Sequence, residues 1–311
     1  MKVFLCEHIH PKALALLNSR AEVVSGWDGL EQVDAIINRN LKLPREVLER
    51  APKLKVIAVH GTGSDGIDLE YCRDHRVTVL YVPFQNSDSV AELVVAMTLA
   101  LLRKIPLADR LVTAGVLKEN APAQLFGNEL QGKTVGLIGV GDITRRVARI
   151  MSHGFGCPVI GYSPHLTGEK AAQLGIERCD TVEEVMGRAD VIVPGVHLTE
   201  QTANLINGDR LSLCKPTAIL VNASRGGVVD EEALYHALKE GRLAGAACDV
   251  WLREPPTTDN PLVGLPNVLA TPHLGANTDE ALERVGVRMV EEIFTVLDGG
   301  EAEYTYHADT V

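Results

Sequence analysis

Short apolar runs alternate with amphipathic segments along the whole chain. One series of runs comprises Val3–Cys6, Val23–Val24, Ala35–Ile37, Val56–Val59 and Val77–Val82. A second series comprises Thr134–Ile138, Val159–Tyr162, Val191–Val193, Ile219–Asn222, Gly245–Val250 and Val268–Thr271. Helical patterns fall between the runs, as at Pro11–Asn18. This alternation predicts mostly parallel sheets that are covered by helices.

The two series of strands predict an α/β protein with two doubly wound parallel-sheet domains. The 311 residues exceed what a single core usually organises, and the 46% of hydrophobic residues is enough for two cores. Ligands of such sheets bind beyond the carboxyl ends of the strands. Functional residues are therefore expected directly after the apolar runs.

The segments around the second series have their own patterns. Ser89 with Glu92 resembles a capping box, and the residues that follow predict a helix to about Arg103. Residues 108–132 have no clear period and predict an excursion or arm. A final helix is expected from near Asn277, where apolar residues recur at helical spacing.

Gly139-Val140-Gly141 follows an apolar run and precedes an amphipathic segment. Gly139 permits a tight turn, and Gly141 lets the backbone approach a pyrophosphate at the N-terminus of the next helix. Thr144 stands where the third glycine of G-x-G-x-x-G is usual, a position that governs helix–strand packing. Glycine pairs also occur in ordinary turns, so the prediction of nucleotide binding depends on this strand–turn–helix context.

The residue after the next strand decides how the adenosine ribose is bound. A carboxylate is usual about 20 residues after the turn, where it bonds the 2′-hydroxyl. Ser163 stands there instead and cannot repel a 2′-phosphate. His165 and Lys170 are the nearby basic residues. NAD and NADP therefore both remain open as cofactors.

Arg225, Glu254 and His273 each follow a different apolar run of the second series. Each alone has an ordinary explanation as a surface charge, a loop residue or a satisfied polar group. Together they are expected at the carboxyl ends of strands in one sheet. Arginine binds a carboxylate through a two-point fork, histidine exchanges a proton near neutral pH, and a neighbouring glutamate stabilises the imidazolium. These residue types suit the reduction of a 2-keto acid.

Charge and cysteine content narrow the function further. The net charge of −11 argues against nucleic acid and anionic membranes as partners. The six cysteines form no C-x-x-C pair and no zinc-like cluster, so no metal site is expected. The N-terminal residues MKVFLCEH contain no secretory apolar region of useful length. A cytoplasmic protein with reduced thiols is expected.

One region of the chain has a highly specific pattern. It reads VNASRGGVVDEEALYHALKEGRLAGAACDVWLREPP and is followed by PNVLATPHLGA. VHGTGSDGIDLE, SVAELVVAMTLALLR and NELQGKTVGLIGVG extend this pattern to nearly the whole chain. Through these segments the chain resembles the D-isomer-specific 2-hydroxyacid dehydrogenases, the family that includes phosphoglycerate, glycerate, formate and D-lactate dehydrogenases.

The resemblance implies an NAD(P)-dependent D-2-hydroxyacid dehydrogenase for acids such as hydroxypyruvate, glyoxylate or phosphoglycerate. It implies a flavodoxin-like substrate domain at residues 1–98 and 276–311, and a Rossmann cofactor domain at residues 99–275. It also implies a homodimer that is joined through the cofactor domain.

Site residues are implied by the same resemblance. Arg225 is expected to bind the substrate carboxylate and carbonyl, His273 to be the general acid/base, and Glu254 to pair with it. The backbone of His60, Gly61 and Thr62 is expected to bind the substrate carboxylate. Asp249 is expected to contact the nicotinamide carboxamide. The full set of expected cofactor contacts is Gly139, Gly141, Asp142, Ile143, Ser163, His197, Thr202, Ala223, Asp249 and Gly275.

Several positions depart from the family pattern. Thr144 replaces a glycine, Ser163 replaces an aspartate, and the usual H-x-P-L-T reads Gly195-Val196-His197-Leu198-Thr199. His60 adds an imidazole to the substrate loop, where it either reads a second polar group of the substrate or is a solvated loop residue.

Two other functions remain open at this stage. One is a nucleotide-sensing binding protein of the same fold with little turnover. The other is a dehydrogenase for phosphite or another non-carbon acid, which would use the same three residues. Turnover of a panel of 2-keto acids with both reduced cofactors would separate the dehydrogenase from the binding protein.

Overall fold

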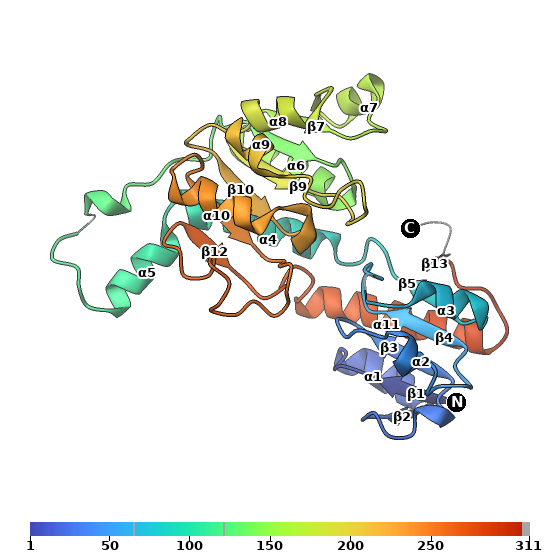
Figure 1. The fold of residues 1–311 in the computed structure, drawn as a ribbon. Helices are drawn as coiled ribbons and strands as arrows, with labels where there is room; N and C mark the ends of the chain where they lie inside the picture. Colours follow the sequence, from blue (N-terminus) through green and yellow to red (C-terminus); the bar gives the residue numbers. More distant parts are fainter. Residues whose placement is uncertain (65, 121, 307–311) are drawn as a thin grey trace. The chain divides into compact units, whose positions relative to one another are not determined.

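The computed structural model describes residues 1–64, 66–120 and 122–306, which form two compact α/β units (Figure 1). The first unit contains Met1–Asn86 and the residues from Ala276 onward, and the second contains Ser87–Gly275. The predicted class, with two doubly wound parallel-sheet domains, is confirmed. The boundary expected at residues 98 and 99 falls inside helix α4 (Ser87–Leu102), and the whole of this helix belongs to the second unit.

The first unit is built on a six-stranded sheet in the order β13-β5-β4-β3-β1-β2. Its elements are β1 (Lys2–Leu5), α1 (Pro11–Asn18), β2 (Glu22–Val24), η1 (Leu30–Gln32), β3 (Ala35–Asn38), α2 (Arg45–Leu48), β4 (Val56–Val59), α3 (Leu69–Asp74), β5 (Thr78–Tyr81), α11 (Asp279–Leu297) and β13 (Thr305–Tyr306). Strands β1–β5 are parallel in the flavodoxin-like order 2-1-3-4-5. Strand β13 joins β5 in the antiparallel direction.

Side chains of the first sheet alternate between two apolar layers, as strand geometry requires. Ala35 and Ile37 of β3 pack in the layer that contains α1 and α11. Ile36 packs in the opposite layer with residues of α2 and α3. All four residues of β3 are buried, which is typical of a central parallel strand.

The second unit is built on a seven-stranded parallel sheet in the order β12-β11-β10-β9-β6-β7-β8. Before the sheet come α5 (Ile105–Thr113) and η2 (Ala123–Leu125). The sheet and its helices comprise β6 (Val135–Ile138), α6 (Asp142–Phe155), β7 (Val159–Tyr162), α7 (Gly168–Gln173), β8 (Glu177–Arg178), α8 (Val182–Arg188), β9 (Val191–Pro194), α9 (Gly208–Ser212), β10 (Ile219–Asn222), η3 (Gly226–Val228), α10 (Glu231–Lys239), β11 (Gly245–Cys248) and β12 (Val268–Ala270). Strands β6 to β11 are the first six of this sheet in chain order, and numbered from 1 to 6 they have the Rossmann arrangement 3-2-1-4-5-6.

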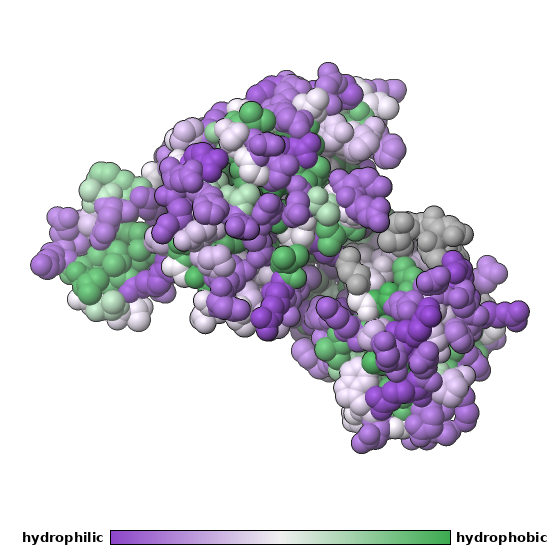
Figure 2. Space-filling view, in the orientation of Figure 1, coloured by the Kyte–Doolittle hydropathy of each residue, from purple (hydrophilic) through white to green (hydrophobic). Residues whose placement is uncertain are grey.

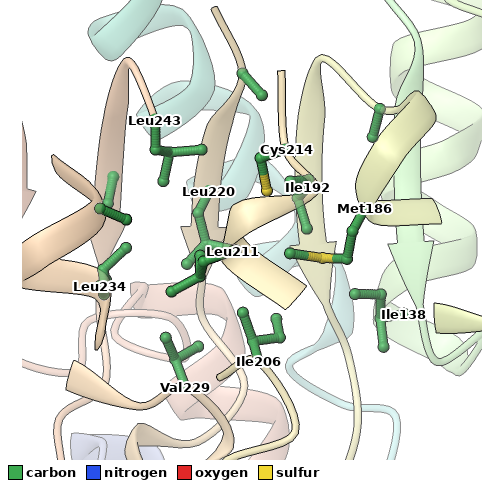
Figure 3. Packing of buried hydrophobic residues seen from close by; sticks show 14 of the residues in the cluster. Ile138, Met186, Ile192, Ile206, Leu211, Cys214, Leu220, Val229, Leu234 and Leu243 are labelled. Atoms are coloured by element: carbon green, nitrogen blue, oxygen red, sulfur yellow. The ribbon is translucent and has the colours of Figure 1, made fainter. Parts of the chain in front are cut away.

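The core of the second unit also consists of two layers. Ile192 of β9 and Leu220 of β10 meet Met186 of α8 and Leu211 of α9 on one face (Figure 3). The neighbouring residues of the same strands face the other layer, which contains α4 and α6. These strands are therefore held from both sides, and their carboxyl ends form a fixed edge for the loops that follow.

Three local predictions need correction or completion. The capping box at Ser89 is wrong, because α4 begins at Ser87 and Ser89 lies inside its first turn, where its hydroxyl donates to the Gly275 carbonyl at 2.7 Å. The segment predicted to lack a period, residues 108–132, begins inside helix α5 (Ile105–Thr113), none of whose residues is buried. Strand β8 was not predicted, since its two exposed residues carry no apolar pattern.

None of the helices in the described residues combines the length and apolar character that a membrane span requires.

Candidate active site

The nucleotide turn lies between β6 and α6 in the second unit. Gly139 has φ +92°, and a Cβ there would lie 2.5 Å from the Gly195 carbonyl oxygen, so the position needs glycine for conformation and for space. Helix α6 begins directly after Gly141, and the N–H groups of its first residues have no carbonyl acceptor within their own helix. These amides and the helix dipole form a site that suits a phosphate group.

Thr144 is accommodated by a second departure from the family pattern. Its Oγ1 accepts from the Gly141 N–H at 2.9 Å and donates to the Gly139 carbonyl at 2.9 Å. A Cβ on Gly195 would lie 2.3 Å from the Thr144 methyl carbon. Thr144 therefore stabilises the turn through these two hydrogen bonds, and the absence of a side chain at Gly195 leaves space for the Thr144 methyl group.

Asp142, the first residue of α6, forms an ion pair with one basic side chain. It pairs with Arg146 one turn later, and Arg146 also contacts Asp88 of α4 at 2.7 Å. The other carboxylate oxygen of Asp142 is buried and has no hydrogen-bond partner among the described residues. The Asp142–Arg146–Asp88 chain ties the N-terminal turn of α6 to α4.

Ser163 follows β7, whose last residue, Tyr162, accepts a hydrogen bond from the Gly139 N–H at 2.8 Å. The Ser163 carbonyl accepts from the Leu166 N–H, which closes a short turn. Arg178 of β8 reaches this turn and donates to the Leu166 carbonyl at 2.8 Å. Sequence reasoning missed this arginine because it lies on the unpredicted strand β8.

His273 and Glu254 form a close pair. The His273 Nδ1 lies 2.8 Å from Glu254 Oε2, and the other carboxylate oxygen accepts from the Trp251 N–H at 3.0 Å. Burial raises the pKa of Glu254, but the hydrogen bond and charge of His273 together with the Trp251 N–H outweigh it, so the net pKa is lowered. With Nδ1 directed at the carboxylate, Nε2 is the nitrogen left for a substrate.

Asp249 organises the loop that carries His273. It is 1% exposed, and its carboxylate accepts from the Thr271 hydroxyl at 2.6 Å and from the Leu274 and Gly275 N–H groups at 2.7 and 2.8 Å. The Asp249 carbonyl accepts from the N–H of His273, which has φ +58°. The expected contact of Asp249 with a nicotinamide remains a prediction, whereas its bonds to this loop are direct.

Arg225 lies in a loop that Asn222 shapes. The Asn222 side chain donates to the Arg225 carbonyl at 3.0 Å and accepts from the Ser224 N–H and hydroxyl. A Cβ on Gly226 would lie 2.0 Å from the backbone carbonyl carbon of Trp251, so this loop packs directly on the Glu254 loop. The charge of Arg225 contributes to the lowered pKa of Glu254. The structure thus brings Arg225, Glu254 and His273 together.

The other expected cofactor residues lie in loops of the same unit. The hydroxyl of Thr202 donates to the His197 carbonyl at 2.5 Å and accepts from the Thr199 N–H at 2.8 Å. Ala223 follows β10 and is half-buried, and Gly275 is buried beside Asp249. The Thr202 hydroxyl therefore stabilises its own loop.

The substrate loop of the first unit follows β4. The N–H groups of His60 and Gly61 donate to the carbonyls of Asn38 and Val59, at 2.7 and 2.8 Å. The N–H groups of Thr62 and Gly63 have no acceptor in the part of the chain that the structure describes. Of the three expected residues, only Thr62 therefore presents a free amide, and Gly63 was missed.

The imidazole of His60 is buried, so the alternative of a solvated loop histidine is wrong. Its exposed fraction is 6%, and its Nε2 lies 3.7 Å from the place where a Cβ on Gly286 of α11 would be. Burial, followed by the charge of Arg39, lowers its pKa to about 4. The ring is therefore neutral at pH 7 and packs against α11.

A family model described as the NAD binding domain of D-isomer specific 2-hydroxyacid dehydrogenases matches residues 95–275. The chain belongs to the D-isomer specific 2-hydroxyacid dehydrogenase family. It is 40% identical over 313 residues to a D-3-phosphoglycerate dehydrogenase from Methanocaldococcus jannaschii, and the match covers 97% of this chain and 59% of that protein. The chain thus spans about three fifths of the length of that relative.

Two further proteins match the chain over nearly their full length. A hydroxypyruvate reductase from Thermotoga maritima is 38% identical, with 95% of this chain and 98% of that protein covered. The crystal structure of an NADPH-dependent glyoxylate/hydroxypyruvate reductase from Sinorhizobium meliloti, in complex with NADP and malonate, superposes with a TM-score of 0.87 at 28% identity, covering 99% of this chain and 97% of that one.

Proposed function

We propose that this member of the family is an NAD(P)H-dependent oxidoreductase that interconverts a 2-keto acid and the matching D-2-hydroxy acid. The observation that carries the proposal is the His273–Glu254 pair, with the charge of Arg225 beside it, in the loops of the sheet that also carries the nucleotide turn. The names of the relatives above support a substrate such as hydroxypyruvate, glyoxylate or phosphoglycerate.

The proposed roles follow from the bonding of the three side chains. Arg225 binds the substrate carboxylate and polarises the ketone through its guanidinium fork. His273 donates a proton from Nε2 to the ketone oxygen during reduction and takes it back during oxidation. Glu254 holds the ring at Nδ1 and stabilises the imidazolium that reduction requires.

The second unit is proposed to bind the cofactor. The open backbone at Gly141, where an added Cβ would meet only the Gly195 carbonyl oxygen at 3.9 Å, and the amides at the start of α6, including that of Ile143, fit a pyrophosphate. When bound, the reduced nicotinamide supplies the hydride. Gly141, Asp142, His197, Thr202, Ala223, Asp249 and Gly275 stay in the proposed set of cofactor-lining positions.

We propose that both NADH and NADPH are used. Ser163 places a neutral hydroxyl where an aspartate would repel a 2′-phosphate. Arg178 adds a positive charge at the Ser163–Leu166 turn, although Asp180 pairs with the same guanidinium. These opposing features favour acceptance of both cofactors over strong selection of one.

The first unit is proposed to bind the substrate carboxylate. The unpaired N–H groups of Thr62 and Gly63 support this role, because adjacent backbone amides form an anion site. His60 is proposed to support the loop from its buried side, and Gly61 to provide the backbone conformation, with φ +139°.

A kinetic panel tests the function. Glyoxylate, hydroxypyruvate, pyruvate and 3-phosphohydroxypyruvate are each assayed with NADH and with NADPH, and the chirality of the product is determined. His273→Gln is compared with His236→Gln, whose imidazole lies on α10 and stacks edge-on against Tyr235. We expect D-products, with activity lost only in His273→Gln. Bound NADH without turnover of any 2-keto acid would refute the proposal.

We also propose that the protein is a homodimer and that the segment between α4 and Asn128, described at residues 103–120 and 122–127 and called the arm from here on, contacts the second copy. The arm leaves the unit at Leu102 and returns there, since the Leu102 carbonyl accepts from the Asn128 N–H at 2.8 Å. Exposed apolar side chains gather on it, at the left of Figure 2. They are Ile105, Val112, Val116 and Phe126, which are 54–68% exposed. A self-complementary dimer contact would cover such a surface.

The oligomeric state tests this interface. Light scattering after size-exclusion chromatography is expected to show a dimer for the native chain and a monomer for Val112→Ser/Phe126→Ser. Leu213→Ser provides a matched control, because Leu213 is also exposed, at 46%, but lies outside the arm. A monomeric native chain, or a dimer in the double variant, would refute the arm as the interface.

A cytoplasmic location is proposed from the thiols. All six cysteines are free, and five of them are buried. Burial raises the pKa of Cys6, Cys72 and Cys248 to about 12 in each case, so these thiols are protonated and unreactive at neutral pH.

A further inference from the structure

The orientation of the two free amides in the substrate loop depends on the residues that hold the adjacent carbonyls. In a planar trans peptide, the C=O and N–H groups point in opposite directions. The Gly61 carbonyl accepts from the Val82 N–H at 3.1 Å, so the Thr62 N–H of the same peptide points away from Val82. The Thr62 carbonyl accepts from the Tyr306 hydroxyl at 2.6 Å, so the Gly63 N–H of that peptide points away from Tyr306.

Tyr306 is itself firmly positioned by the first unit. It lies on β13, where it pairs with Val79 of β5. Its ring stacks on that of Tyr81 with centroids 4.4 Å apart. The strand pairing and the ring stack therefore hold the hydroxyl in place beside the loop. The Gly61 carbonyl is bound by the N–H of Val82, the residue directly after β5.

We propose that Tyr306 is a positioning residue for substrate binding: its hydroxyl fixes the Thr62–Gly63 peptide so that the Gly63 N–H is oriented for a carboxylate before substrate arrives. This inference rests on the proposed function for its substrate, a 2-keto acid. Without the hydroxyl, the peptide is free to rotate, and substrate binding must then order it at a cost in affinity. The hydride and proton transfers do not involve this bond.

Tyr306→Phe tests the inference, because it keeps the stacked ring and removes only the hydroxyl. We expect the KM for the best 2-keto acid to rise about three- to tenfold, the range that corresponds to one neutral hydrogen bond. The kcat and the Kd for NADH are expected to stay within about twofold. Tyr304→Phe is the matched control, since its ring contacts Tyr81 and Phe84 and it lacks a hydrogen bond to the loop among the described residues.

The backbone 15N order parameters of Thr62 and Gly63, measured by NMR without substrate, separate this inference from the proposed function. Lower order parameters in Tyr306→Phe than in the native protein and in Tyr304→Phe are expected whether or not the native chain reduces a 2-keto acid. Unchanged order parameters and unchanged KM in a folded Tyr306→Phe would overturn the inference. Equal losses of kcat and thermal stability in both variants would overturn it as well, because they would indicate a general packing effect.

Discussion

The contact between Gly195 and Thr144 predicts a specific steric coupling behind the nucleotide turn. Gly195 follows β9, and its backbone has no positive φ, so alanine is allowed there by conformation alone. The obstacle is space, because the added Cβ would lie 2.3 Å from the Thr144 methyl carbon. Thr144→Ser removes this methyl and retains the hydroxyl that bonds Gly139 and Gly141.

The magnitudes follow from packing. Gly195→Ala alone is expected to destabilise the second unit by about 1–3 kcal/mol, the usual cost of overpacking a filled site. Thr144→Ser alone is expected to cost about 1 kcal/mol, since one buried methyl is lost. In the double variant the new Cβ occupies the vacated space, so the two effects should offset each other by about 1–2 kcal/mol, within the range for residues in contact.

Urea unfolding of the native protein, the two single variants and the double variant, followed by tryptophan fluorescence, measures this coupling. Trp251 is 3% exposed and reports on the second unit, and a Trp27→Phe background removes the signal of the first unit. The NADH Kd gives a second measure, because the strained turn should also bind the cofactor less well. If Gly195→Ala costs the same in the Thr144→Ser background as it does beside the native threonine, to within about 0.3 kcal/mol, the steric argument is refuted.

Three further variants test the catalytic and cofactor assignments. Arg225→Lys is expected to keep the native melting temperature and to lower kcat/KM by a factor on the order of a hundred or more, because a point charge cannot replace the fork; near-native kinetics would remove Arg225 from the site. Glu254→Gln is expected to lower kcat/KM for reduction by about tenfold or more, because the His273 Nδ1 then faces a neutral amide instead of the carboxylate that holds it; unchanged kinetics would show that Glu254 is not the partner of His273. Ser163→Asp is expected to shift the ratio of kcat/KM for NADH over NADPH toward NADH by about 1–3 kcal/mol, and a native enzyme that already prefers NADH a thousandfold would contradict our interpretation of position 163.

The periodicity of apolar residues predicted most of the strands and helices, and it failed only at short strands and at one helix start. The buried strands stood out because their neighbours are helical and polar. The two-residue strands β8 and β13 are too short for any period, so Arg178 and Tyr306 could not be placed. The predicted start of α4 was wrong, since Ser89 bonds a residue far along the chain instead of capping its own helix.

The site prediction shows a similar limit. Residues that follow strands in one parallel sheet must share an edge, so the grouping of Arg225, Glu254 and His273 followed from topology. The burial of His60 and the fit of Thr144 against Gly195 did not, because both depend on which side chains meet across long sequence separations. Sequence motifs therefore identified the candidate site residues, whereas the surroundings of each side chain depend on tertiary packing.

The hydrogen bond between Ser89 and Gly275 has a topological consequence. It joins the first turn of the second unit to the last residue of that unit at 2.7 Å, so the two ends of the unit lie next to each other. A segment with adjoining ends can be inserted into a loop of another fold without stretching either host strand. Residues 87–275 therefore have the architecture of a transplantable module, and the host chain needs to supply only one loop to receive it.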